Sequence, residues 1–415
     1  MLVLGMVCDP MRAARREYIR GTMLSSIPPA VLAFRFLVGG ELILPERGAD
    51  TTPLLQELKV EAERFGDLWV LPHVLDGPAC NKQCSCIEKQ HAWFTRALRE
   101  WPDALWFGKT EDDCYINLRQ LLFDLDRLEP RHAESPSSSH IVYGLINIIC
   151  AAPARAALEA ALDGDNGVIG GGDSFLGDLE PKIDFPEVAA ASLRYLDRTH
   201  RSRGCVGAPM PFPTGPLAVL SADLTRALFT SPLVKAYHRL GHELNREADG
   251  CRRTHPNVSH SMAAHGCDAM LAVWLEAVMW RPPRPLFRLR AASPSSGSPV
   301  ARAAAVQSTP TTPSRTQSRL RAKLGPKLEG RVRRVTLASM TWTKGHHYAK
   351  GAGGMGYVAP GASSVAVHAL KRATSSDWEH VHNVSSAQAR TRFPPLLWRY
   401  EMHESPPFRM AFTPL

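Results

Sequence analysis

Long apolar runs are missing from this chain of 415 residues. The two candidates are Met1–Val7 and the uncharged segment Ile141–Ala154, and both are shorter than the roughly 20 apolar residues that a membrane-spanning helix needs. The first run also lacks the basic residues that precede the apolar core of a secretory signal. We therefore expect no segment of this sequence to cross a membrane, and we interpret Ile141–Ala154 as a buried strand followed by a turn.

Acidic residues are scarce in one segment. The chain carries 49 Lys and Arg against 40 Asp and Glu, a formal net charge of +9. Arg281–Arg334 contains thirteen basic residues and one acid, Glu329, so this segment carries +12 and the remainder of the chain −3. The positive charge is therefore local, and no nucleic-acid-binding motif accompanies it. A nucleic-acid-binding function would rest on charge alone, and we expect no specific nucleic-acid partner.

The same region has few apolar residues. Residues 291–330 are mainly Ser, Pro, Thr, Ala and Arg, a composition that cannot bury enough apolar area to offset the entropy lost on ordering. We predict that 286–330 is a disordered basic linker or insertion. It separates a core, residues 1–285, from a C-terminal extension, residues 331–415, that completes the core or packs on it.

Two sequence motifs for ligands are also absent. Cys80, Cys84 and Cys86 form a C-x3-C-x-C cluster near His91, without the second ligand pair of a structural zinc site. A local disulfide or free thiols are the alternatives, and nine cysteines leave at least one thiol unpaired in a monomer. The glycine-rich segment Gly164–Gly177 lacks the G-x4-G-K-[ST] order of a phosphate-binding loop. It is either a nucleotide contact of another kind or a mobile loop.

Strand and helix patterns alternate along the first 130 residues. The apolar residues predict strands at Leu2–Val7, Phe34–Val38, Leu68–Leu71 and Ala104–Gly108, and helices at Arg12–Met23, Thr52–Phe65, Ile87–Trp101 and Ile116–Leu128. This order is typical of an α/β fold, a mostly parallel, Rossmann-like sheet with helices on both faces. Later segments predict a strand leading into a helix at Leu217–Phe229, a helix at Asp268–Trp280 and a strand at Val365–His368. Ligands of such sheets bind beyond the carboxyl ends of the strands.

Three consecutive carboxylates, Glu111, Asp112 and Asp113, follow the predicted strand Ala104–Gly108. Adjacent carboxylates repel one another, and a divalent cation would relieve the repulsion. Mn2+ and Mg2+ favour carboxylate oxygens and keep positions open for phosphate oxygens. The alternative is a solvated acidic turn that caps the following helix.

The chain contains, in this order, six motif-like stretches: Arg16–Thr22, Phe36–Gly39, Glu61–Asp67, Lys109–Asn117, Pro213–Ser221 and Cys267–Leu275. As an ordered set they resemble motifs of the β-1,3-galactosyltransferase and fringe-like glycosyltransferase family. Four departures from those motifs stand out: Met23 replaces a Trp, Glu111 an Asp and Cys267 a Glu, while the strand around Ala218 lacks a Gly and a Tyr. Val367–Lys371 resembles algal and plant-like relatives more loosely.

The resemblance implies a GT-A fold and an inverting, metal-dependent transfer. The donor would be UDP-galactose or UDP-N-acetylglucosamine, and the acceptor a hydroxyl of a glycan or glycoprotein. Asp113 and Asp112 would hold Mn2+ or Mg2+ against the diphosphate, beside Glu111. Asp268 would be the general base that takes the acceptor proton; the alternative role for Asp268 is to cap the helix that follows it.

The resemblance also implies further ligands. A late histidine usually completes the metal site, and His368 is our first choice, with His346 and His347 the second; a structural histidine is the alternative. Arg16 and Arg20 would lie near the uridine or diphosphate, unless they form a solvated helix face. Lys371 would approach the diphosphate.

The family is typically anchored in the Golgi membrane, so the resemblance implies a Golgi protein. Either an anchor precedes Met1 or this copy is soluble, and the start of the sequence at the first predicted strand favours the anchor. A non-catalytic relative that binds sugar nucleotide or glycan is the main rival to an enzyme. The substitutions at Cys267, Ala218 and Glu111 motivate it.

Overall fold

The computed structural model describes most of the first 150 residues and shorter parts of the rest. The described residues are 1–134 except 26 and 81, 140–150, 209–232, single positions between 234 and 278, and the segments 333–339, 345–347, 365–368, 375–386, 396–402 and 410–414. The predicted linker 286–330, the glycine-rich Gly164–Gly177, Asp268 and Lys371 lie outside the described residues.

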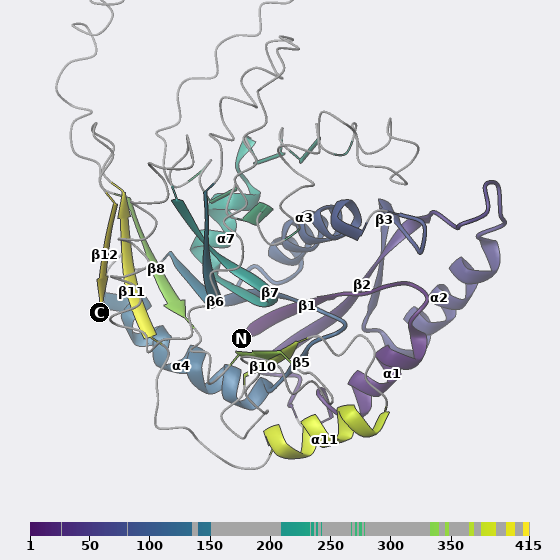
Figure 1. Ribbon diagram of the computed structural model, residues 1–415, viewed down its shortest axis with the longest axis horizontal. Coiled ribbons are helices and arrows are strands. Elements are labelled where there is room, and N and C mark those ends of the chain that lie inside the picture. Colours follow the sequence, from purple (N-terminus) through teal and green to yellow (C-terminus); the bar gives the residue numbers. More distant parts are fainter. Residues whose placement is uncertain are drawn as a thin grey trace, which may run out of the picture.

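A nine-stranded sheet forms the centre of the protein (Figure 1), with the strand order β12-β11-β8-β6-β7-β4-β1-β2-β3. A second sheet has three strands in the order β5-β10-β9. The strands are β1 Leu2–Val7, β2 Leu32–Leu42, β3 Leu68–Asp76, β4 Trp106–Glu111, β5 Tyr115–Ile116, β6 Ile141–Cys150, β7 Pro209–Ser221, β8 Arg333–Ser339, β9 Gly345–His347, β10 Ala366–His368, β11 Leu396–Met402 and β12 Met410–Pro414.

The large sheet has a parallel part and a mixed part. From β3 through β2 and β1 to β4, all neighbours are parallel. Beyond β4, β7 is antiparallel to both β4 and β6, whereas β8 is parallel to β6. Strands β11 and β12 then add antiparallel pairs. Three strands from the segment after residue 330 therefore belong to the same sheet as β1.

Helices cover both faces of this sheet (Figure 1). Helices α3 and α7 lie on one face, and α1, α2, α4 and α11 lie toward the other. The helices are α1 Ala13–Gly21, α2 Thr52–Phe65, α3 Lys82–Glu100, α4 Leu118–Glu134, α7 Ala222–Phe229 and α11 Ser375–Ser386. Among the described residues, none of the helices combines the length and the apolar character that crossing a membrane requires.

Alternating side chains of the strands build two separate cores. In β1, Val3 joins the core beneath α3 and α7, whereas Leu2, Leu4 and Met6 join the core beneath the other helices. This is the two-residue period of a strand buried on both faces. Gly5 allows α3 to approach β1 closely, because a Cβ at this position would lie 2.5 Å from ring atoms of Trp93.

The predicted α/β class is confirmed, and most of the predicted elements occur with shifted ends. Helix α2 has the predicted bounds. Strand β2 was predicted to end at Val38, but it continues to Leu42, because an irregularity between Gly39 and Glu41 lets it keep pairing with β3. Helix α3 begins at Lys82 rather than at the predicted Ile87, so Cys86 lies inside the helix.

Candidate functional site

The acidic triplet lies where the strand order of the parallel part reverses. The chain runs from β1 to β2 and β3 on one side and then returns to β4 on the other side of β1. In such sheets, ligands bind at the carboxyl ends of the strands that flank this reversal. Here β1 ends at Val7 and β4 ends at Glu111, and the two residues are register partners. The backbone N–H of Asp112 then donates a hydrogen bond of 3.1 Å to Val7 O.

Strand β4 is longer at its carboxyl end than predicted. The predicted strand ended at Gly108, but Lys109, Thr110 and Glu111 remain paired with β1. Strands β1 and β7 flank this extension on its two sides, because Lys109 and Thr110 pair with both of them. Glu111 therefore belongs to the strand, and the turn begins at Asp112.

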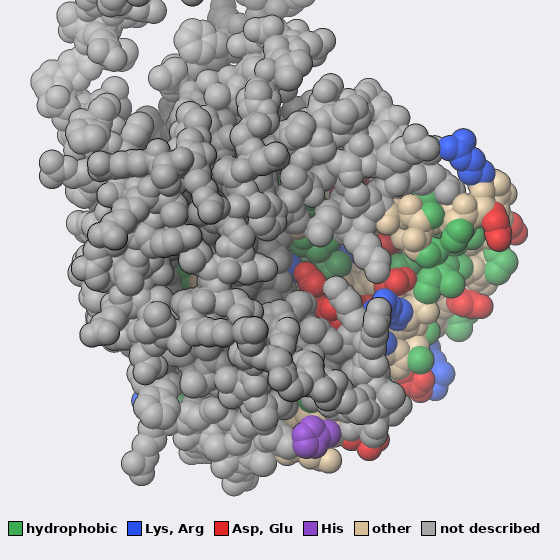
Figure 2. Space-filling model, viewed as in Figure 1, with side chains coloured by type: hydrophobic (Ala, Val, Ile, Leu, Met, Phe, Trp, Pro, Cys, Tyr) green, Lys and Arg blue, Asp and Glu red, His purple; other side chains and the backbone are tan. Residues whose placement is uncertain are grey.

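Asp112 is held by groups from the start of the chain. Its Oδ2 accepts a hydrogen bond of 3.2 Å from the Asp9 N–H, and its Oδ1 lies 3.5 Å from Arg15 Nη1 and 3.6 Å from Arg12 Nη1. Burial raises the pKa of Asp112, and the two guanidinium groups partly offset that rise. Figure 2 shows acidic and basic side chains gathered in a hollow near the middle of the visible face.

Asp113 is buried in the turn just before the short strand β5. The residue is 1% exposed, and the Cys114 thiol lies 3.5 Å from its Oδ1. Strand β10 runs antiparallel to β5, with Ala366 opposite Ile116 and Val367 opposite Tyr115. His368 is the residue after Val367 in β10, and Cys114, next to Asp113 in sequence, is the residue before Tyr115 of β5. The backbone thus brings the predicted histidine strand to the acidic turn.

The alternative histidines occur in the same small sheet. His346 and His347 belong to β9, and His347 is the register partner of His368. Carboxylate oxygens and an imidazole nitrogen are ligands that Mn2+ accepts. The donor types of Asp112, Asp113 and His368 therefore fit a divalent cation.

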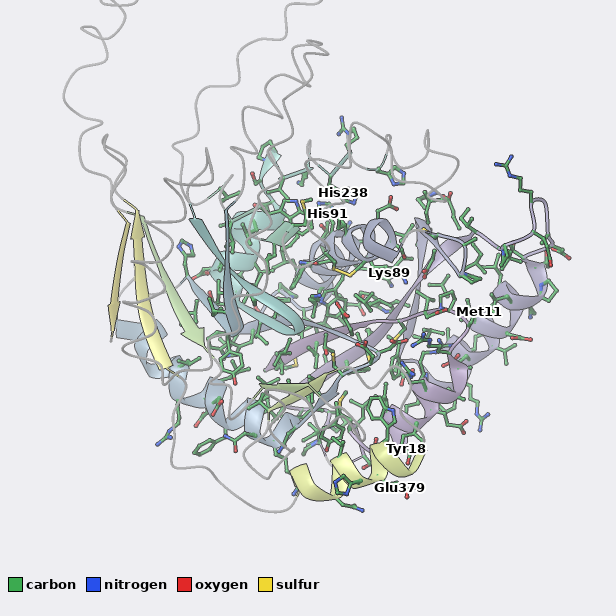
Figure 3. All side chains as sticks on the ribbon, in the orientation of Figure 1. Met11, Tyr18, Lys89, His91, His238 and Glu379 are labelled. Carbon is green, nitrogen blue, oxygen red and sulfur yellow. A yellow bond between two sulfur atoms is a disulfide. The ribbon has the colours of Figure 1, made fainter. Side chains whose placement is uncertain are left out.

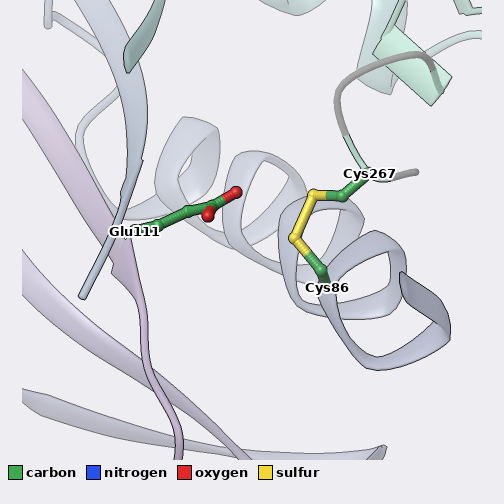
Figure 4. Close-up of side chains that lie close together, drawn as sticks. All are labelled: Cys86, Glu111 and Cys267. Atoms are coloured by element: carbon green, nitrogen blue, oxygen red, sulfur yellow. A yellow bond between two sulfur atoms is a disulfide. The ribbon is translucent and has the colours of Figure 1, made fainter. Parts of the chain in front are cut away.

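Glu111 faces a disulfide rather than the other carboxylates. Cys86 of α3 is bonded to Cys267 (Figure 4), across a sequence separation of 181. Ligand atoms of Glu111, Cys86 and Cys267 lie within 4.8 Å of one another, and they form the one such group of three that the described part of the chain shows. The expectation that Cys86 would form a local disulfide or remain a free thiol is therefore wrong. Cys80 is also disulfide-bonded.

Arg16 and Arg20 bind other parts of the protein. Arg16 is 1% exposed, and its Nη2 lies 2.6 Å from Glu61 Oε2. Arg20 pairs with Glu61 at 2.9 Å and with Asp67 at 2.7 Å, and its guanidinium lies over the ring of Phe65. These carboxylates raise the pKa values of both arginines against the opposing effect of burial. The alternative of a solvated helix face does not hold for Arg16.

A buried lysine of α3 joins the carboxyl ends of β1 and β3, and sequence reasoning missed it. Lys89 Nζ lies 2.5 Å from Asp76 Oδ2 and donates to Cys8 O at 2.6 Å. The same Asp76 oxygen accepts a hydrogen bond of 2.7 Å from Gly39 N. Lys89 and Asp76 are 3% and 4% exposed, so the ion pair is internal. A charged residue inside a predicted amphipathic helix normally indicates the solvated face, so the sequence offered no signal for it.

Two histidines, one of them on the same helix, stack on each other. The rings of His91 and His238 have centroids 3.7 Å apart and planes 10° apart; His91 belongs to α3, and His238 lies beside it (Figure 3). Burial and nearby positive charge lower the pKa of His91 to about 3, and burial with His242 lowers that of His238 to about 4. His242 in turn lies 3.2 Å from Glu88. The spacing of His238 and His242, one helical turn, was the available signal.

Comparison with known proteins adds no family to these observations: no model of a known protein family matches the chain, and no curated protein matches it.

Proposed function

We propose that this protein is a metal-dependent, inverting glycosyltransferase with a GT-A fold. It transfers galactose or N-acetylglucosamine from a UDP-sugar to a hydroxyl of a glycan or glycoprotein. The observation that carries the proposal is the position of the acidic triplet. Glu111 ends β4, and Asp112 and Asp113 follow it, at the reversal of the parallel strand order, where ligands of α/β sheets bind.

The small sheet supports the same proposal. Strand β10, which ends at His368, pairs with β5, and β5 directly follows the turn that contains Asp113. Asp113 and Asp112, with His368, would hold Mn2+ or Mg2+, and the cation would stabilise the negative charge of the departing UDP. Asp112 is oriented for this role by the Asp9 N–H and by Arg15.

The remaining roles follow from the resemblance. Asp268 would take the proton of the acceptor hydroxyl, and Lys371 would neutralise charge on the diphosphate. Arg16 and Arg20 would act indirectly, because their partners are Glu61 and Asp67. They would hold α1 in place at the edge of the donor site. A Golgi location belongs to the same proposal.

A non-catalytic relative that binds a sugar nucleotide or glycan is the second candidate. Two observations favour it. Arg12 and Arg15 already neutralise Asp112. Cys267, at the position where the family has a carboxylate, forms a disulfide with Cys86.

Donor turnover by the purified chain separates the two candidates. UDP release from UDP-galactose and UDP-N-acetylglucosamine would be measured with Mn2+ and with a chelator. For the enzyme, we expect release that needs the cation and that falls at least about a hundredfold in Asp113→Asn, because that charge stabilisation is worth several kcal/mol. Asp126→Asn, at an exposed position of α4, is the matched control.

Other outcomes decide against the enzyme. UDP-sugar binding by calorimetry without turnover supports the non-catalytic relative. If the wild-type chain neither binds nor turns over a UDP-sugar, both candidates fail. Thermal unfolding of Asp113→Asn shows whether the variant is folded, and the chelator test on wild-type protein does not depend on any variant.

A further inference from the structure

The disulfide between Cys86 and Cys267 has an asymmetric environment. Lys109 Nζ lies 3.6 Å from Cys267 Sγ, and Lys109 is 0% exposed. Its ammonium group also lies 3.3 Å from Glu111 Oε1. The positive charge is therefore next to one of the two sulfur atoms, in a place where water does not screen it.

A second donor is available to the same sulfur. Gln90 Oε1 lies 3.1 Å from Cys267 Sγ, and Gln90 is 0% exposed. Its Nε2 is buried and has no hydrogen-bond partner among the described residues. Rotation of the amide by half a turn exchanges the oxygen and the nitrogen. The Nε2–H group would then donate to Cys267 Sγ, and this donor would be satisfied.

We infer that the Cys86–Cys267 bond is a site of thiol–disulfide exchange, in which Cys86 is the attacked sulfur and Cys267 the leaving thiolate. The reductant is a dithiol, either a small molecule or a protein with two neighbouring cysteines. Lys109 and Gln90 stabilise the thiolate that leaves, and a more stable leaving thiolate departs faster. Cys86 is also the more exposed residue, 8% against 4% for Cys267.

The electrons and atoms of the exchange balance as follows. A thiolate of the reductant attacks Cys86 Sγ and forms a mixed disulfide with it. The bond between the two protein sulfurs breaks, and its electron pair stays on Cys267 Sγ as a thiolate. The second thiol of the reductant, as its thiolate, attacks the mixed disulfide, which releases Cys86 and leaves the reductant oxidised. Two protons from the reductant's thiols or from solvent convert both protein thiolates into thiols.

Exchange would change the protein mechanically as well. The bond links α3 covalently to Cys267, and Met270 and Trp274, which follow Cys267 in the chain, belong to the same core as Cys86. Reduction removes this link between the two segments. The inference does not depend on glycosyl transfer, since it concerns the sulfur chemistry alone.

Differential alkylation with peptide mass mapping tests the inference on the full chain. Oxidised protein is treated with dithiothreitol, free thiols are blocked at set times, and the remaining disulfides are then reduced and labelled. We expect Lys109→Met to slow the release of Cys86 and Cys267 about tenfold, because the leaving thiolate loses its cation. Lys59→Met, at an exposed position of α2, should release them at the wild-type rate.

Two further variants keep the inference testable if Lys109→Met does not fold. Gln90→Leu should also slow release, and Glu111→Gln should accelerate it, because the glutamate repels both the incoming and the leaving thiolate. Reduced glutathione, a monothiol, should be trapped on Cys86. Glutathione found on Cys267, or wild-type release rates in Lys109→Met, Gln90→Leu and Glu111→Gln alike, would overturn the inference.

Discussion

Acidification below pH 6.5 should destabilise the fold through the two stacked histidines. His91 is 9% exposed, and its ring lies between those of His238, Phe229 and Trp274. The pKa of His91 is lowered from 6.5 to about 3, and that of His238 from 6.5 to about 4. Both rings therefore stay neutral in the folded protein at a pH where they are charged in the unfolded chain.

The direction in which the free energy of unfolding changes with pH follows from proton binding. Between pH 6.5 and about 4, the unfolded chain binds a proton at each histidine and the folded protein does not. The free energy of unfolding therefore falls as the pH falls through this window. Each histidine contributes at most about 1.4 kcal/mol per pH unit, so the pair should cost about 4 kcal/mol between pH 7.5 and pH 5. This is a large part of a typical stability of about 5–15 kcal/mol.

Urea unfolding at several pH values measures this effect. His91→Phe removes one of the two groups, and its apolar ring suits the neighbours Phe229 and Trp274. The variant should therefore lose about half of the pH dependence, whatever its stability at pH 7.5. His380→Gln, at an exposed position of α11, should keep the wild-type dependence. The same pH dependence in His91→Phe and in wild-type protein would refute this reasoning.

Two changes away from the acidic turn have predictable costs in urea unfolding. Lys89→Met leaves the buried Asp76 carboxylate without its cation and should lower the free energy of unfolding by about 3–5 kcal/mol. The control Lys59→Met should change the free energy of unfolding by less than about 0.5 kcal/mol. Equal changes in the two variants would show that the buried ion pair contributes nothing to stability. Gly5→Ala should cost about 1–3 kcal/mol, because the added Cβ meets a tryptophan ring of α3 at 2.5 Å. Gly21→Ala, where a Cβ meets nothing within 4 Å, should be neutral or stabilising, and a cost as large as that of Gly5→Ala would contradict the packing explanation.

The sequence by itself was enough to predict the α/β class and most of the first elements. Strand β1 and helix α2 have the predicted bounds, because the apolar period of a local segment reflects which of its faces are buried. The position of the acidic triplet at a strand end was predicted for the same reason. The local pattern contains no information about where a strand stops pairing, so the extension of β4 to Glu111 was not predicted.

Only the tertiary structure decided which distant groups meet. The bond between Cys86 and Cys267 joins residues 181 positions apart, and the spacing of the cysteines in the chain does not encode that pairing. Lys89 lies in a helix whose pattern indicates a solvated polar face, yet its charge is buried against Asp76. Sequence periodicity reports the average burial of a face. Whether a buried charged side chain forms an ion pair depends on distant chain segments that only the fold brings together.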